Sequence, residues 1–166
     1  TYLLAGASLC GGKAYALLEK FFRELVKEAT GQEKALYKTL EKLAGDGKAS
    51  CTGRENRQKL QIETTFDGTR VHPEQTGSIT NLSTDNFTPA AFVYGTLEGM
   101  SRELYQMYQT IQNGTGMQIK RMVGSGNGLR KNPVLCEIVE EMFGARLVLA
   151  ECEEEAATGA ALSSMQ

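Results

Sequence analysis

The chain has 166 residues, a formal net charge of −2, 41% hydrophobic residues and 23% charged residues. This length suits one domain with a core of its own, and the composition is that of a globular protein. The slight negative charge argues against broad electrostatic binding to nucleic acid or to anionic membranes. Because no apolar run approaches the length of a membrane span, we also expect no membrane insertion.

Four cysteines (Cys10, Cys51, Cys136 and Cys152) are widely spaced, and His72 is the only histidine. The chain has no Cys-x-x-Cys motif, which disfavours a zinc site, and a disulfide framework is not expected in a chain of this length. The pattern therefore predicts reduced thiols, no metal-binding residues in this chain and a cytoplasmic location.

The first residues predict a buried strand and a turn from Thr1 to Cys10. Gly11 and Gly12 follow, and apolar residues at helical spacing then predict a helix that runs to about Ala29. Because the chain begins with Thr1 and opens directly in an apolar strand, we expect it to be a fragment of a longer protein.

The next part of the chain predicts a second helix over residues 33–44, which the glycines of residues 45–47 should end. Residues 48–58 are polar and are interpreted as a loop. Alternating polar and apolar residues predict a half-buried strand over 59–66, and a second short strand is expected over 78–82.

The longest predicted helix begins with the pair Thr88-Pro89, an N-cap followed by a proline in the first turn, and runs to about Gln112. Gly95 and Gly99 lie inside this helix. Each glycine costs roughly 1 kcal/mol relative to alanine in a helix interior, and close packing against another backbone would justify that cost.

A glycine-rich loop, Gly124-Ser125-Gly126-Asn127-Gly128, follows a predicted strand at residues 119–123. Asn132 should cap a helix that ends at Gly144, and a strand over 145–150 and a final helix should follow. The bare amides of such a loop can hold phosphate or ribose oxygens, and the missing side chains make room for a flat base. The same residues equally suit a tight turn that binds no ligand.

Several motifs in the same order resemble the C-terminal domain of the FGGY carbohydrate kinases. They are the entry Leu-Ala-Gly-Ala-Ser-Leu-Cys-Gly-Gly at residues 4–12, Asp-Gly-Thr-Arg at 67–70, the helix signature at 88–101, the glycine loop and its helix at 124–135, and Glu-Glu-Glu-Ala-Ala-Thr-Gly-Ala-Ala-Leu at 153–162. The likeness covers nearly the whole chain.

The resemblance implies an α/β fold, the ribonuclease-H-like half of an actin-like ATPase, with a mixed sheet, packed helices and one incomplete domain over residues 1–166. It implies ATP and Mg²⁺ as cofactors and transfer of the γ-phosphoryl group to a sugar hydroxyl. Carried over by position, the loop residues Gly124, Ser125, Gly126 and Asn127 would lie against adenine and ribose. Asn132 would lie near the base, and Gly11 and Gly12 would lie near the phosphates.

The same resemblance places the family's catalytic aspartate, its phosphate-binding Gly-Thr hairpin and its sugar-binding N-terminal domain upstream of Thr1. We therefore expect no catalytic residue within this chain and no activity from it alone, since phosphoryl transfer depends on positioning and charge stabilisation. The sugar would bind through the absent domain, and formation of a homodimer is left open.

Two other functions also suit parts of the sequence. The order of strand, glycine loop, helix and a strand ending in Glu151 is similar to a dinucleotide-binding oxidoreductase, although a helix that starts only at Asn132 lies too far from the loop. Alternatively, the chain could be a non-catalytic interaction domain, in which the helix containing Gly95 and Gly99 and the small-residue tail at 156–162 serve only for docking.

Overall fold

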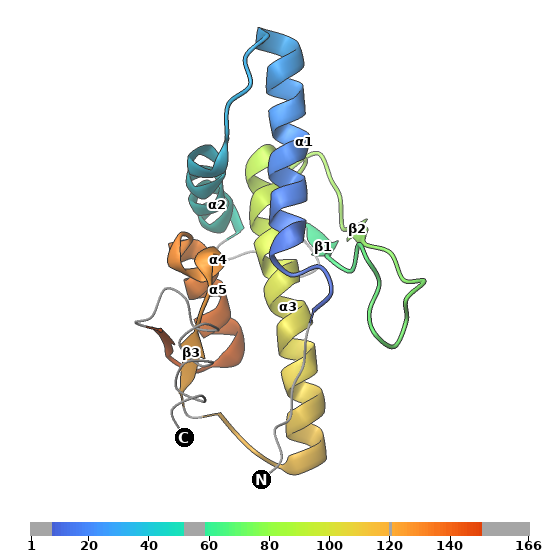
Figure 1. The fold of residues 1–166 in the computed structure, drawn as a ribbon, viewed down its shortest axis with the longest axis vertical. Coiled ribbons are helices and arrows are strands. Elements are labelled where there is room, and N and C mark those ends of the chain that lie inside the picture. Colours follow the sequence, from blue (N-terminus) through green and yellow to red (C-terminus); the bar gives the residue numbers. More distant parts are fainter. Residues whose placement is uncertain (1–7, 52–58, 120, 151–166) are drawn as a thin grey trace, which may run out of the picture.

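The computed structural model describes residues 8–51, 59–119 and 121–150. Within these ranges the molecule is elongated, and its two longest helices, α1 and α3, lie side by side (Figure 1). The elements in chain order are α1 (Gly12–Thr30), α2 (Tyr37–Cys51), β1 (Gln61–Glu63), β2 (Ser78–Thr80), α3 (Pro89–Thr115), β3 (Met122–Gly124), α4 (Asn127–Arg130), α5 (Pro133–Phe143) and β4 (Leu147–Leu149).

Helix α3 is the central element, and it packs against α1, α2, α5 and β1. The predicted start is confirmed, because the Ala91 N–H donates to the hydroxyl of Thr88 at 3.2 Å and Pro89 stands in the first turn. The helix ends at Gly116 in the left-handed conformation. Figure 1 shows β1 and β2 on one side of α3 and the helices α2, α4 and α5 on the other.

The glycines inside α3 are explained by the strand that crosses them. A Cβ atom at Gly99 would collide with the backbone oxygen of Ile62, and one at Gly95 would lie 3.4 Å from the oxygen of Leu60. Both partners belong to β1 or to the residue just before it. The expectation that these glycines permit close approach of another backbone is therefore confirmed.

Helix α2 differs from the prediction at both ends. It begins at Tyr37 rather than near residue 33, and it continues through Gly45 and Gly47 to Cys51. A Cβ atom at Gly47 would collide with the backbone oxygen of Ala90 and lie 2.7 Å from Cβ of Tyr94. The glycines predicted to end this helix were thus misinterpreted, because Gly47 instead allows α2 to pack closely against α3.

The main core lies between α2, α3 and α5. Its fully buried members are Leu40, Ala44, Val93, Tyr94, Leu97, Leu135, Ile138 and Val139. At its edge the Lys48 ammonium pairs with two carboxylates of α5, those of Glu137 at 3.0 Å and Glu141 at 2.7 Å. One surface of α3 therefore packs against the strand β1, and the other packs against the helices α2 and α5.

The strands form two pairs within the described residues. β1 and β2 are antiparallel, with Ile62 opposite Ile79, and β3 and β4 are parallel, with Val123 opposite Val148. Each strand has three residues, so the runs predicted over 59–66 and 145–150 are longer than the paired segments.

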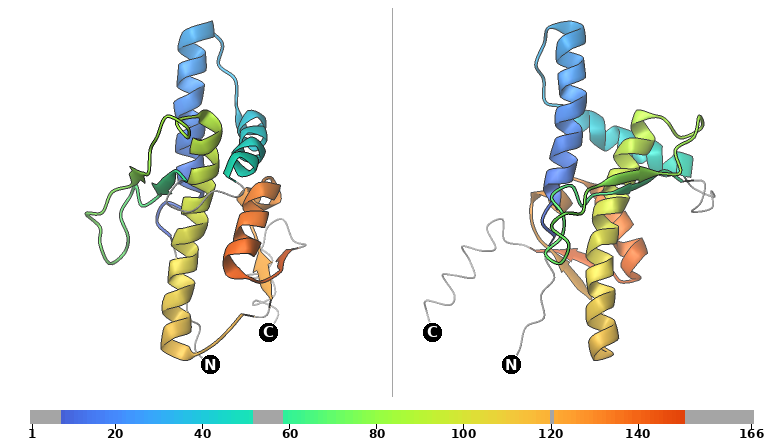
Figure 2. Two further views of the ribbon diagram at one scale, coloured as in Figure 1. Left: turned by 180° about the vertical axis from the view of Figure 1, so that it is seen from behind. Right: turned by 90° about the vertical axis from the view of Figure 1, so that its right-hand side faces the viewer.

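The glycine loop leads into a helix that the sequence did not predict. The short helix α4 begins directly after Gly126, and Asn132 then caps α5 as expected. The predicted final helix, the strand over the first residues and Cys152 lie outside the described residues. Figure 2 shows the same arrangement from two further directions. In the described ranges, no helix is both long enough and apolar enough to cross a bilayer.

Candidate functional site

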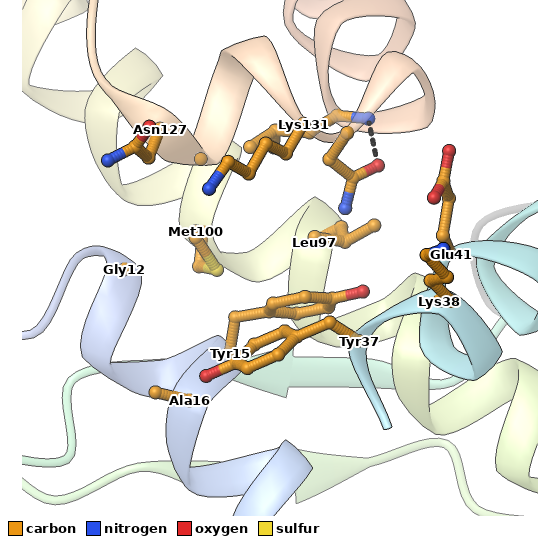
Figure 3. Close-up of a pocket in the computed structure, with 13 residues that line it drawn as sticks. Gly12, Tyr15, Ala16, Tyr37, Lys38, Glu41, Leu97, Met100, Asn127 and Lys131 are labelled. Carbon is orange, nitrogen blue, oxygen red and sulfur yellow. Dashed lines mark hydrogen bonds between the residues drawn. The ribbon is translucent and has the colours of Figure 1, made fainter. Parts of the chain in front are cut away.

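A cavity of about 700 Å³ opens where α1, α2, α3, α4 and α5 meet (Figure 3). Its walls combine aromatic and apolar side chains with a few polar ones. They are formed by Gly12, Tyr15, Ala16, Tyr37, Lys38, Glu41, Leu97, Met100, Asn127, Gly128, Lys131, Asn132 and Leu135. This mixture is typical of small-molecule sites, in which apolar walls bind the ligand and a small number of polar groups orient it.

The two tyrosines form one wall of the cavity. Tyr15 comes from the first turn of α1 and Tyr37 is the first residue of α2, and their ring centroids are 6.3 Å apart at an angle of 38°. Figure 3 shows the rings lying across from Asn127 and Lys131. Tyr15 is one of the apolar residues whose helical spacing predicted α1 and a place in the core, and nothing in the sequence singled out Tyr37.

Asn132 uses its side chain at the boundary between the helix and the cavity. Its Oδ1 atom accepts the N–H of Leu135 at 3.1 Å and so caps α5, and the residue is 6% exposed. Asn132 also lines the cavity. Because the oxygen is held by the cap, the amide nitrogen is the group that remains for a ligand.

The hydroxyl of Tyr15 is buried at the same end. Burial raises the pKa of Tyr15 to about 12, the Glu41 carboxylate adds to this rise, and the Asn132 amide opposes it. Although that amide is close, the hydroxyl makes no hydrogen bond of good geometry with any residue in the described ranges. Tyr15 therefore stays neutral at physiological pH, and the ring acts as an uncharged aromatic surface.

The first part of the glycine loop packs against the protein itself. Gly124 is buried, and a Cβ atom there would lie 2.8 Å from Cδ1 of Leu129 and 3.0 Å from Cδ1 of Leu147. Its carbonyl accepts the N–H of Ala150 at 2.8 Å. This glycine makes room for leucine side chains rather than for a base.

The second part of the loop is open. Ser125, Gly126 and Asn127 are exposed, and Gly126 has φ of 91°, which favours glycine. Ser125 and Gly126 do not line the cavity, whereas Asn127 and Gly128 do. The loop therefore reaches the cavity only through the start of α4.

The other two predicted glycines, Gly11 and Gly12, also differ in their relation to the cavity. Gly11 has φ of 37° and donates its N–H to the Ser8 hydroxyl at 2.8 Å, and it does not line the cavity. Gly12, the first residue of α1, does line it. The structure thus brings together Gly12, Asn127 and Asn132 of the predicted residues, and their role in nucleotide binding stays a prediction.

No group of three or more His, Cys, Asp or Glu side chains is placed to hold a metal ion within residues 8–51, 59–119 and 121–150. The charged groups at the cavity are Lys38, Glu41 and Lys131, and a single carboxylate does not form a cation site. A Mg²⁺ ion that accompanies ATP would have to take its ligands from the phosphates and from other residues.

Comparison with solved structures defines the class of fold. The chain superimposes on xylulose kinase from Rhodospirillum rubrum with a TM-score of 0.62 and 21% identity, over 84% of this chain and 26% of that chain. It also matches Plasmodium falciparum glycerol kinase with ADP, at a TM-score of 0.57 and 18% identity, over 76% of this chain and 25% of that chain. The fold is therefore part of the actin-like ATPase domain of these kinases, as the sequence predicted.

The family model for the C-terminal domain of the FGGY carbohydrate kinases matches residues 1–165, and the chain belongs to this family. Among curated proteins, sedoheptulokinase from Mus musculus is 28% identical over 172 residues, which is 100% of this chain and 33% of that protein. Sedoheptulokinase from Homo sapiens is 28% identical over 166 residues, which is 98% of this chain and 32% of that protein. The chain thus spans about a third of these relatives, and the resemblance drawn from the motifs is confirmed.

The family match, rather than local geometry, decides against the oxidoreductase interpretation. That interpretation was disfavoured because the helix should start only at Asn132, but the short helix α4 begins at Asn127, within the glycine loop. The geometric argument was therefore wrong. The match over residues 1–165 identifies a carbohydrate kinase domain instead.

Proposed function

We propose that the chain provides the adenosine-binding part of an ATP-dependent sugar kinase, which transfers the γ-phosphoryl group of ATP to a hydroxyl of a sedoheptulose-like ketose or a related sugar. The observation that carries this proposal is the cavity that unites Gly12 with Asn127 and Asn132, residues from two separate family motifs. Its size and apolar walls suit a base and a ribose.

The chemistry of the cavity supports the proposal. The tyrosines and Leu97, Met100 and Leu135 provide an apolar surface for a flat base, and Lys131 adds a positive charge to the lining. The first residue of α1, Gly12, also lines the cavity. The N-terminus of this 19-residue helix carries the positive end of the helix dipole, which favours a phosphate group nearby.

The remaining parts of the reaction would come from outside this chain. Its relatives are about three times as long, and no catalytic carboxylate is assigned here. In the intact enzyme, closure between domains would bring the sugar and the γ-phosphate together and exclude water. Mg²⁺ bound to the phosphates would neutralise charge that develops during transfer.

Two glycine substitutions provide a direct test in the full gene product that contains this chain. A Cβ atom at Gly128 or at Gly114 meets nothing within 4 Å, and neither residue has positive φ, so a side chain at either position is compatible with the fold. Gly128 lines the cavity and Gly114, near the end of α3, does not. Gly126 is less suitable, because its φ of 91° would strain any other residue.

We expect Gly128→Leu to abolish ATP binding measured by calorimetry, because the leucine side chain occupies the cavity, whereas Gly114→Leu binds ATP like the unsubstituted protein. Thermal unfolding of both variants should show an intact fold. ATP binding that survives Gly128→Leu would contradict the proposed site. Failure of the unsubstituted protein to bind ATP would contradict the adenosine-binding role and would favour an interaction domain.

A further inference from the structure

The exposed aromatic ring at the cavity belongs to Tyr37. This residue is 49% exposed and begins α2, while Tyr15 of α1 lies beside it, with ring centroids 6.3 Å apart and the Tyr15 hydroxyl buried. Figure 3 shows both rings along the same wall, with the ring of Tyr37 reaching back toward Ala16 of α1. A ligand that enters the cavity can therefore contact the ring of Tyr37 without any movement of the core.

A polar network on α1 fixes the position from which Tyr37 projects. The N–H of Leu36, the preceding residue, donates to Oε1 of Glu19 at 3.0 Å, and Glu19 is only 4% exposed. Arg23 neutralises this buried carboxylate at 3.3 Å and also binds Glu33 at 2.6 Å. The connection between α1 and α2 is thus tied down at two points, although it contains no regular structure.

The opposite wall leaves space for a flat group. Gly128 carries no side chain, and an added Cβ atom would meet nothing within 4 Å. The side chain of Lys131 runs along this wall in Figure 3, with its ammonium group near Asn127. An aromatic ring held in place on one side, and on the other a wall that has no side chain at Gly128, are the geometry of a stacking site for a base.

We propose that Tyr37, supported by Tyr15, is the surface on which the purine base of ATP stacks. This inference rests on the proposed function and adds to it a binding residue outside the glycine-rich loop. Glu19 and Arg23 are positioning residues, because they hold the start of α2 and do not reach the cavity. Affinity for the base is thereby coupled to the connection between α1 and α2.

The test compares three substitutions of Tyr37 in the full gene product, with ATP as the ligand and calorimetry as the measurement. We expect Tyr37→Phe to bind ATP within about twofold of the unsubstituted protein, since the ring is retained. Tyr37→Leu and Tyr37→Ala should each weaken ATP binding about tenfold, because base–aromatic stacking is lost. Phe21→Ala is the matched control, since Phe21 is an exposed aromatic residue of α1 that does not line the cavity.

The leucine variant separates stacking from simple packing. If the Tyr37→Leu variant binds ATP as tightly as the Tyr37→Phe variant does, an apolar side chain of similar size is sufficient, and the stacking role is overturned. Unchanged binding in Tyr37→Ala overturns it as well, while ATP binding that remains sensitive to Gly128→Leu leaves the proposed function intact. Failure of the unsubstituted protein to bind ATP overturns the proposed function, and this inference with it.

Discussion

Two regions of this molecule use glycine for opposite purposes. Around α3, Gly47 and Gly99 lie in direct contact with a neighbouring backbone, and an added Cβ atom would collide with a carbonyl oxygen. Around the cavity, Gly12 and Gly128 face empty space, and an added Cβ atom would touch nothing within 4 Å. In the first region the missing side chain is replaced by protein, and in the second it is left open.

The comparison shows that the structural role of a glycine in a helix depends on the atoms that surround it. Gly47 and Gly128 both occupy helices without positive φ, so the backbone alone does not require glycine at either position. Their neighbours differ, and this makes one a packing residue and the other part of a cavity wall. The two regions should therefore respond in opposite ways to an added methyl group.

The largest effect is expected for Gly99→Ala. The new methyl group would collide with the backbone oxygen of Ile62, so β1 would have to move away from α3. We expect a loss of about 1–3 kcal/mol in the free energy of unfolding, measured by urea denaturation. Gly45→Ala is the control, because this exposed glycine of α2 has open space around it. Equal stability of the two variants would remove the distinction between the regions.

Asn132 lies at the border between them, and its substitution should affect both. Asn132→Ala removes the cap that accepts the N–H of Leu135, which should lower the free energy of unfolding by about 1 kcal/mol. Asn132→Asp keeps an oxygen for the cap and should restore most of this loss. Urea denaturation of the pair measures the cap, and an aspartate variant as unstable as the alanine variant would show that the amide nitrogen contributes to the fold.

A smaller effect of opposite sign is expected for Gly128→Ala. The methyl group meets no atom, and alanine is the better helix former, so the free energy of unfolding should rise by about 0.5–1 kcal/mol. Thermal unfolding without nucleotide measures this gain. A decrease would show that the open wall of the cavity closes on itself.

The smallest effect is expected for the carboxylate of Glu98, a residue of α3 that does not line the cavity. Burial raises the pKa of Glu98, against the opposing influence of Lys59 and Arg102. The folded protein therefore retains this proton at a pH where the unfolded chain has lost it, and stability should fall as the pH rises from the ordinary glutamate value through the raised one. Glu98→Gln should abolish this part of the pH dependence.

Urea denaturation between about pH 4 and about pH 7 is the measurement for Glu98. Glu24→Gln is a suitable control, because the Glu24 side chain is 62% exposed. An identical pH dependence in the Glu98 variant and the unsubstituted protein would contradict the assigned effect of burial.

The sequence by itself determined the family, the order of most elements and the helix boundaries that depend on local chemistry. Thr88-Pro89 and Asn132-Pro133 mark helix starts because a side-chain oxygen binds a free backbone N–H, and Gly144 ends α5 in the left-handed conformation. These signals act within one helical turn, so they can be recognised without knowledge of the fold.

Tertiary structure alone decided which residues meet at the cavity. Tyr37 and Asn132 are 95 positions apart (132 − 37) and line the same cavity only because α2 and α5 pack on the same side of α3. The same packing carries α2 through Gly47, where the sequence had indicated a helix end. Contacts between distant segments depend on the shapes of both surfaces, and the sequence pattern of one segment does not predict the shape of the other.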